Sequence, residues 1–352
     1  MQARTFISLA IVLCFAARDS DGKSAKTDEK PDSAALSRFT FTEPHMGTRF
    51  RIVLYAANEQ TARDAARAAF DRIAALDNCM SDYKPESELM RLCAKAGGDP
   101  IPVSPELFTV LQKAQDVAAK SDGAFDVTVG PVVRLWRVSR RNHKLPDGEK
   151  LAKARDLVGY RNVQLDAKAR TVRLLKAGMQ LDLGGIAKGY SADEALVVLQ
   201  KKGIQSALVA AGGDIAVGAA PPGKEGWDVA IIPLQSGDAS PHLLLHDAAV
   251  STSGDAEQFV EIDGVRYSHI VDPRTGIGLI GRSQVTVVAR RGIDSDSLTK
   301  VIAVLGPERG MPIVEEAGAT ARVLRLTDRG KEMSASKNFP KTVYKPAQEK
   351  DH

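Results

Sequence analysis

The sequence predicts a mixed α/β fold, either α/β or α+β, with much hairpin content and built as one folded segment. Stretches in which apolar and polar residues alternate are interleaved with stretches in which apolar residues recur at helical spacing. The 352 residues are 43% hydrophobic and 26% charged, the composition of an ordinary globular protein. No Pro/Gly/Ser-rich linker long enough to separate independent domains interrupts this pattern, so we expect one large domain or two closely packed lobes.

The first predicted strand is Arg49–Ala56, because its side chains alternate in polarity. The first predicted helix is Thr61–Leu76, whose apolar residues are spaced three and four apart. Further helices are predicted at Pro105–Lys120, Ile186–Lys202 and Ser295–Leu305. Further strands are predicted at Asn162–Leu165, Thr171–Leu174, Ser206–Ala211, Trp227–Pro233, Phe259–Ile262 and Gln284–Ala289.

The N-terminus has the pattern of a secretory signal peptide. Arg4 precedes an apolar run over residues 6–17 that is too short to span a bilayer as a mature helix. We therefore expect residues 1–17 to be a leader and the protein to be exported, in the periplasm. Cys14 leaves a lipoprotein anchored to a membrane open as an alternative, although Leu13 is larger than the residue that usually precedes a lipidated cysteine.

The remaining chain divides by composition. Residues 18–36 are almost all charged, small or polar, which predicts a disordered tether. Residues 37–336 form the expected folded domain, and residues 337–352 read as a strand end or a frayed C-terminal tail. Two cysteines remain beyond the leader, Cys79 and Cys93, and the sequence leaves open whether they pair. The net charge of +4 is small for this length, so nothing points to a nucleic-acid partner.

The segment LDLGGIAKGYSADEAL favours phosphate binding. Gly184 and Gly185 precede a predicted helix, and Lys188 lies in its first turn. Glycines let backbone N–H groups approach an anion, the helix dipole adds partial positive charge, and the lysine adds a full one. A tight turn with a surface lysine is the alternative interpretation.

A second segment contains the hydroxyl-rich stretch Ser251–Gly254, predicted as a turn, and His269 just before the turn sequence DPRTG. A histidine there could be a general base beside a bound phosphate, or it could be an exposed residue of a hairpin. In a third segment, Asp296 is followed by Thr299 and Lys300 on the same helix face. Asp296 could therefore bind a hard cation with help from Thr299, pair with Lys300, or cap the helix.

Taken together, these segments resemble the ApbE family of FAD:protein FMN transferases. The matching blocks occur in the family's order: MGTRFRIVLY, MSDYKPESEL, GAFDVTVGP, LDLGGIAKGYSAD, AAGGDIAV, STSGD, HIVDPRTG and DSDSLTKVIAVLG. The resemblance implies a two-lobed fold with FAD in the cleft, Mg²⁺ beside the pyrophosphate, and transfer of FMN to a Ser or Thr of an acceptor protein, with AMP leaving.

The resemblance also implies site residues, carried over position by position. Those that would contact FAD are Met46, Tyr83, Ala124, Phe125, Asp126, Asp182, Lys188 and Ile270. His269 would lie close to the reacting phosphate, as the candidate catalytic base. The metal would be held by the backbone carbonyl of Gly185, the carboxylate of Asp296 and the hydroxyl of Thr299.

One position departs from the family. The family has a metal-binding Thr four residues after the Asp, and this chain has Lys300 there. A protonated ammonium has no lone pair to offer Mg²⁺. Thr299 could take over, Lys300 could replace the metal and supply part of its charge, or metal binding and catalysis could be lost. The alternatives to the transferase are therefore FAD hydrolysis, an exported FAD-binding or flavin-carrier protein without catalysis, and a general phosphate-ester binding protein.

Overall fold

The computed structural model describes residues 35–235, 237–254 and 259–345. From Leu36 onward the described chain belongs to one compact unit. The predicted signal peptide with Cys14, and the predicted tether up to residue 34, lie outside the described residues. None of the described helices is long and apolar enough to cross a membrane.

The central element is an eight-stranded sheet with the order β1-β2-β6-β7-β10-β14-β15-β16. Every neighbouring pair in it is antiparallel. Its strands are β1 (Ser37–His45), β2 (Thr48–Ala56), β6 (Ala207–Ala211), β7 (Asp214–Val217), β10 (Ala248–Gly254), β14 (Arg282–Ala289), β15 (Thr320–Thr327) and β16 (Gly330–Ala335). The mixed α/β prediction is confirmed, and the antiparallel pairing makes it the α+β kind.

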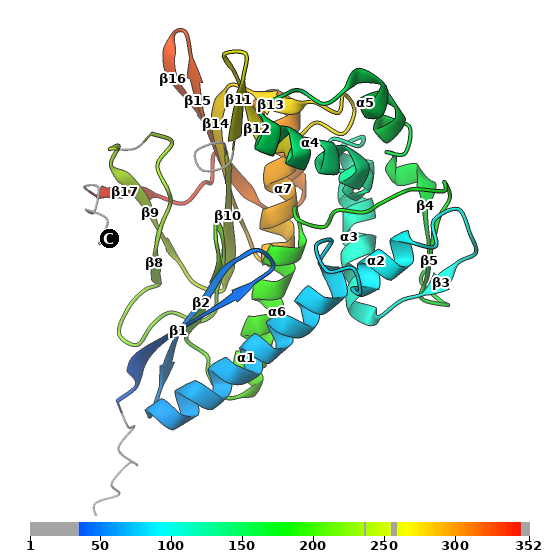
Figure 1. Ribbon diagram of the computed structural model, residues 1–352. Coiled ribbons are helices and arrows are strands. Elements are labelled where there is room, and N and C mark those ends of the chain that lie inside the picture. The colour runs from blue at the N-terminus through cyan, green and yellow to red at the C-terminus, as the bar shows by residue number, and fades with distance from the viewer. Residues whose placement is uncertain (1–34, 236, 255–258, 346–352) are drawn as a thin grey trace, which may run out of the picture. The chain divides into compact units, whose positions relative to one another are not determined.

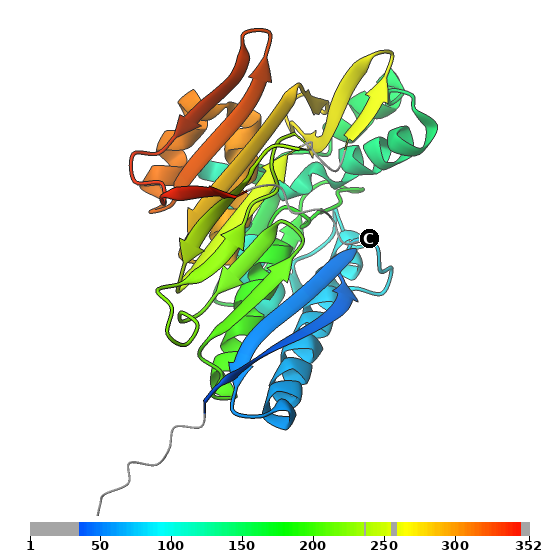
Figure 2. The same ribbon diagram turned by 90° about the vertical axis from the view of Figure 1, so that its left-hand side faces the viewer.

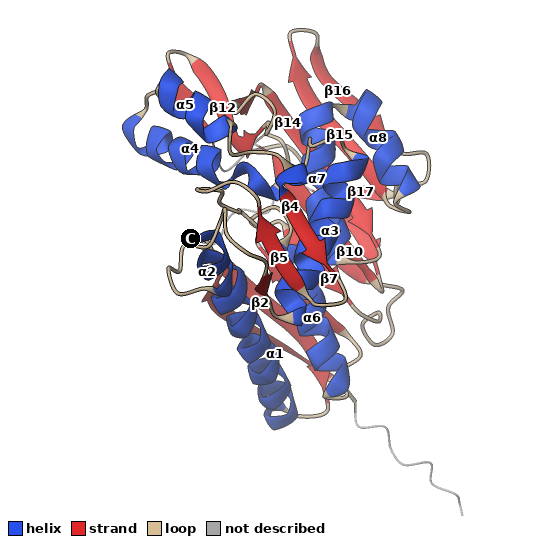
Figure 3. Ribbon diagram, turned by 90° about the vertical axis from the view of Figure 1, so that its right-hand side faces the viewer, coloured by secondary structure: helices blue, strands red, loops and turns tan. Residues whose placement is uncertain are grey.

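Helices cover one face of this sheet, as Figure 3 shows. The α-helices of the described chain are α1 (Glu59–Met80), α2 (Glu88–Cys93), α3 (Pro105–Lys120), α4 (Gly130–Asn142), α5 (Gly148–Arg155), α6 (Ala187–Lys201), α7 (Gly292–Leu305) and α8 (Pro307–Glu316). Of these, α4 and α5 pack on a smaller sheet instead. The neighbours α1, α6, α7 and α8 pack side by side along the sheet. Their buried apolar residues form two clusters, one between α1, α6 and β2 and one between α3, α7 and β14.

Three small sheets surround the large one (Figure 1, Figure 2). They are β3-β5-β4, with β3 (Ile101–Pro102), β4 (Val163–Asp166) and β5 (Thr171–Leu174); β11-β12-β13, with β11 (Phe259–Ile262), β12 (Val265–Val271) and β13 (Gly278–Ile280); and β17-β9-β8, with β8 (Trp227–Ala230), β9 (Ser240–Leu245) and β17 (Thr342–Lys345). The last of these packs on the face of the large sheet away from the helices, through Trp227, Val229 and Leu243.

One sequence interpretation in the sheets needs correction. The stretch Ser251–Gly254 is not a turn but the second half of β10, paired with β7 and β14. Its hydroxyls are satisfied inside the protein: Ser251 Oγ lies 2.9 Å from Ser295 Oγ. The C-terminal segment, expected to be a strand end or a frayed tail, contains the strand β17, which pairs with β9. Cys79 and Cys93 are separate thiols.

Helices α6 and α7 cross at two glycines. A Cβ on Gly189 would lie 2.0 Å from the carbonyl oxygen of Gly292, so no larger residue fits this crossing. Each helix also caps the other. Asp193 of α6 accepts hydrogen bonds from the backbone N–H groups of Gly292 (2.6 Å) and Ile293 (3.0 Å), and Asp296 of α7 accepts one from Gly189 N–H (3.1 Å). The hypothesis that Asp296 caps its own helix is therefore wrong, because α7 begins four residues earlier.

The cap at Asp193 predicts a pH dependence of stability. Burial raises the pKa of Asp193 to about 6, against an ordinary value of 3.8, and the two N–H groups only partly oppose this. Because the folded-state pKa is the higher one, the stabilising contribution is complete below the ordinary value and is lost as the pH rises through about 6. Relative to Asp193→Asn, the free energy of unfolding should fall by up to roughly 3 kcal/mol between pH 4 and pH 7. Urea unfolding across this range measures it, and parallel curves for the two proteins would contradict it.

Candidate active site

A pocket of about 390 Å³ opens where the helix-covered side of the sheet meets the loops after α1 and before α6. Ten of the sequence-predicted residues line it: Met46, Tyr83, Ala124, Phe125, Asp126, Asp182, Gly185, Lys188, His269 and Ile270. The pocket thus brings together residues far apart in the sequence, from Met46 in the β1–β2 turn to Ile270 on β12. Asp296 and Thr299 are not part of the lining, but Lys300 of α7 is.

Lys188 is held at the N-terminus of α6. Its Nζ lies 2.8 Å from Asp214 Oδ2 and 3.7 Å from Asp296 Oδ2, and it donates to the carbonyl oxygen of Gly184 at 3.1 Å. Burial by itself lowers the pKa of Lys188, but the two carboxylates outweigh it, so the pKa is raised and the side chain is a cation. A fixed cation at a helix N-terminus is suited to binding a phosphate.

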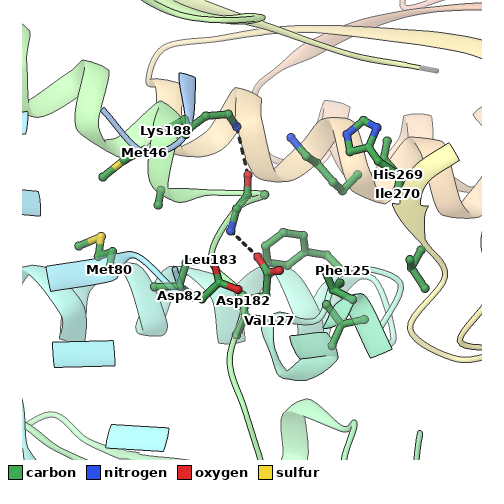
Figure 4. Close-up of a pocket in the computed structure, with 18 of the residues that line it drawn as sticks. Met46, Met80, Asp82, Phe125, Val127, Asp182, Leu183, Lys188, His269 and Ile270 are labelled. Atoms are coloured by element: carbon green, nitrogen blue, oxygen red, sulfur yellow. Dashed lines mark hydrogen bonds between the residues drawn. The ribbon is translucent and has the colours of Figure 1, made fainter. Parts of the chain in front are cut away.

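The loop before α6 is fixed from the opposite wall. Asp182 Oδ1 accepts a hydrogen bond from Gly184 N–H (2.8 Å), and Asp182 Oδ2 lies 3.0 Å from Arg137 Nη2. Figure 4 shows Lys188 and His269 on one side of the pocket and Asp182 on the other. Burial, and next the charge of Asp82, raise the pKa of Asp182. The Asp182–Arg137 pair therefore holds the glycine turn in place below Lys188.

Flat and apolar surfaces form the rest of the pocket. Phe125 is 5% exposed and Ala124 is 1% exposed, so both are packed into the wall. Tyr83 is 67% exposed at the pocket, and the guanidinium of Arg137 lies 4.3 Å from its ring centroid. Met46 lies in the two-residue β1–β2 turn with a φ of 48°, a conformation unusual for a residue with a side chain. Surfaces of this kind suit a flat heterocycle.

Asp126 lines the pocket, but its carboxylate is fully used by the protein. Oδ1 accepts from the N–H and the hydroxyl of Thr128, at 2.8 and 2.7 Å, and Oδ2 accepts from Tyr160 N–H at 2.7 Å. Burial raises the pKa of Asp126. Its side chain therefore fixes the loop that carries Phe125, and any contact of residue 126 with a ligand falls to its backbone.

His269 and Ile270 lie on β12, and His269 also lines a second, smaller pocket of about 180 Å³. The two pockets share Gly184, Lys188, Gly213, His269 and Lys300 among their linings. A molecule in the second pocket could therefore reach the same lysines and the same histidine as a ligand in the first. This arrangement places a candidate base where two substrates would meet.

The predicted magnesium donors do not fit a divalent cation here. Thr299 Oγ1 donates to the carbonyl oxygen of Asp296 (2.7 Å) and lies 2.8 Å from Ser253 Oγ, so it is engaged away from the pocket. The carboxylate of Asp296 binds the ammonium of Lys300. Within the described part of the chain, no cluster of three or more His, Cys, Asp or Glu side chains is arranged to hold a metal. An ammonium beside Asp296 would repel a dication.

Sequence reasoning did not single out several residues of this site. Each of them contributes charge to the pocket or to a residue that lines it: Arg137, Asp82, Asp214 and Arg140. Asp214 follows the glycine pair of AAGGDIAV, which is a usable signal for a turn but not for its partner Lys188. Arg137 belongs to a helix whose arginines carry no local signature.

Comparison with known proteins agrees with this geometry. A family model described as the ApbE family matches residues 46–324. The FAD:protein FMN transferase of Treponema pallidum (strain Nichols) is 34% identical over 300 residues, covering 80% of this chain and 83% of that protein. The Vibrio cholerae (strain O395) protein of the same name is 31% identical over 302 residues, covering 84% and 90%. The solved structure of "Flavin Transferase ApbE from Vibrio cholerae" has a TM-score of 0.78 at 30% identity, covering 86% of this chain and 98% of that one. The chain belongs to the ApbE family.

Proposed function

We propose that this protein is a flavin transferase that moves the FMN half of FAD onto a Ser or Thr hydroxyl of an acceptor protein and releases AMP. The observation that carries the proposal is the position of Lys188. It lies at a helix N-terminus in a pocket with apolar and aromatic walls, and a second pocket opens onto it beside His269. A phosphate bound there would be reachable by another molecule's hydroxyl.

In the proposed reaction, the hydroxyl oxygen attacks the phosphorus of the FMN half. A new P–O bond forms, the bond from that phosphorus to the bridging oxygen of the pyrophosphate breaks, and AMP leaves with the bridging oxygen. His269 takes the proton of the hydroxyl. Lys188 and the N-terminus of α6 stabilise the charge that builds up on the phosphate oxygens.

The other residues bind and orient the substrate. Phe125 and Tyr83 offer ring faces for the isoalloxazine or the adenine. The bonds from Asp182 to Gly184 N–H and Arg137 keep the glycine turn rigid, so its backbone can approach the pyrophosphate. Magnesium dependence, which the family resemblance implies, stays a prediction that the surroundings of Asp296 do not favour.

The test is to mix the full chain with FAD and a flavin-acceptor domain, with Mg²⁺ and with chelator, and to measure the acceptor's intact mass. We expect a mass increase of one FMN, equimolar AMP, and no increase on an acceptor whose target hydroxyl is replaced by alanine. Release of free FMN and AMP with an unmodified acceptor would instead indicate FAD hydrolysis. FAD binding without any product, in either buffer, would contradict the enzyme.

Export is also part of the proposal, and it rests on the sequence of residues 1–17. Expression of the full chain followed by fractionation should place it outside the cytoplasm. A Cys14→Ser variant that moves from the membrane fraction to the soluble periplasmic fraction would support the lipoprotein alternative, and an unchanged distribution would support a cleaved soluble form.

A further inference from the structure

One buried carboxylate, Asp296, interacts with both lysines of the candidate phosphate site. Asp296 is 0% exposed and interacts with the ammonium groups of Lys300 and Lys188. Asp296 thus anchors two cations at the edge of the pocket.

The side chain of Lys300 fills the space between α7 and the glycine turn. Its Cε and Cγ lie 3.5 and 3.6 Å from the position of a Cβ built on Gly185. The side chain of Lys300 therefore packs beside Gly185, and its ammonium pairs with Asp296, so it contacts two of the residues predicted to hold the metal. Lys300 is 16% exposed and lines both pockets. An ammonium has three N–H donors, and the bond to Asp296 uses one, so others can face a ligand.

The charge balance shows what Lys300 contributes. Lys188 and Lys300 are cations, and their partners Asp214 and Asp296 are carboxylates. These four side chains sum to zero. Without Lys300 the group would carry one net negative charge and would repel a pyrophosphate, unless another cation took its place.

We propose that the ammonium of Lys300 is a built-in substitute for a divalent cation, so that the protein binds FAD and transfers FMN without Mg²⁺. This inference rests on the proposed function. Lys300 neutralises Asp296 and donates hydrogen bonds to oxygens of the pyrophosphate, where it stabilises the charge on the departing AMP. No bond to Lys300 forms or breaks, and no further reactant is needed.

The first test compares FAD affinity in chelator and in excess Mg²⁺, by titration calorimetry, for the wild type and for Lys300→Thr. The wild-type affinity should be the same in both buffers. In chelator, Lys300→Thr should bind FAD at least roughly tenfold more weakly, the ratio expected for losing one hydrogen bond to a charged group. Mg²⁺ should restore its affinity, because removing the ammonium opens the space beside Asp296 and introduces a hydroxyl. Wild-type binding that needs Mg²⁺ would overturn the proposal.

The second test detects the metal itself and needs no turnover. Mn²⁺ is added to each FAD-bound protein and followed by electron paramagnetic resonance. The wild type should leave the Mn²⁺ free, and Lys300→Thr should bind one ion. A bound ion in the wild type at the same affinity as in the variant would overturn the proposal. Thermal unfolding of both proteins verifies that the variant folds, and Mg²⁺ should raise the melting temperature of the FAD-bound variant only.

Lys113→Thr is the matched control. Lys113 of α3 pairs with Asp294 of α7, the helix that carries Lys300, but Lys113 does not line either pocket. It should leave FAD affinity and metal response as in the wild type. Failure of the proposed function is recognised separately: a wild type that binds no FAD in any buffer contradicts the flavin transferase, whereas a wild type that transfers FMN only with Mg²⁺ contradicts the role of Lys300 alone.

Discussion

Replacing Lys188 with methionine should lower the rate of FMN transfer by roughly 10²–10³-fold, the loss typical when one preorganised donor to a developing negative charge is removed. The reason is that Lys188 is fixed before substrate binds. Its contacts with Asp214 and with the carbonyl oxygen of Gly184 hold the ammonium over the glycine turn. Single-turnover transfer at saturating FAD measures the effect on the chemical step.

The same substitution should also destabilise the fold. Asp214 is 5% exposed and Asp296 is 0% exposed in their side chains, and the first of them loses its closest cation. Because the side chain of Lys188 is partly exposed, the cost should be at most about 3–5 kcal/mol, the range for breaking a fully buried pair. Lys188→Met combined with Asp214→Asn removes the unpaired charge, so it should recover most of the stability and none of the transfer activity.

The exposed Lys201, in the last turn of the same helix, provides the matched control. Lys201→Met should change neither stability nor rate. Transfer within a few fold of the wild type by a folded Lys188→Met protein would contradict the phosphate role assigned to Lys188.

The fold could be predicted from sequence where local signals were strong. Helix α3 has the predicted bounds, because Ser104 caps it, Pro105 occupies its first position, and Lys120 lies in its last turn. Strand β5 also has its predicted bounds, since Thr171–Leu174 alternates in exposure. Local capping and alternation do not depend on the rest of the chain, so the sequence alone is sufficient for them.

The hydroxyl-rich part of β10 could not be predicted in the same way. Ser favours turns because its hydroxyl competes for backbone hydrogen bonds, and Gly favours them because it has no side chain to restrict the backbone. In the folded protein the hydroxyls of Ser251 and Ser253 face α7 instead, where Ser253 Oγ meets Thr299 Oγ1 at 2.8 Å. Only the packing of α7 against the sheet decides between turn and strand.

The site residues also divide into those that local sequence predicts and those that only the fold brings together. The turn at Gly184 and the helix start with Lys188 form one continuous segment, so the sequence alone predicts a phosphate-binding site there. The partners that give it charge, Asp214 and Arg137, come from elements far away in sequence. The consequence of Lys300 depends on a helix crossing that places α7 against Gly185. The sequence leaves three outcomes open for Lys300. Its packing beside Gly185 and its ion pair with Asp296 favour replacement of the metal.

Replacing His269 with glutamine should lower FMN transfer by roughly 10²–10⁴-fold, the usual contribution of a general base. FAD affinity should stay nearly unchanged, because the charges that hold the phosphates belong to Lys188, Lys300 and the N-terminus of α6. A fall in the rate of the bound complex without a fall in affinity separates a base from a residue that only binds substrate.

The dependence of the transfer rate on pH provides the sharper measurement. A general base must be unprotonated, so the wild-type rate should decline on the acidic side of its profile, and the variant should lose that decline. His246→Gln is the control, because this histidine is exposed beside β10 and pairs only with its neighbour Asp247 among the contacts resolved in the described chain. An acidic limb that persists in His269→Gln would assign the proton transfer to another group. Since Asp182 has a raised pKa and lies across the pocket, Asp182→Asn would then be the variant to compare.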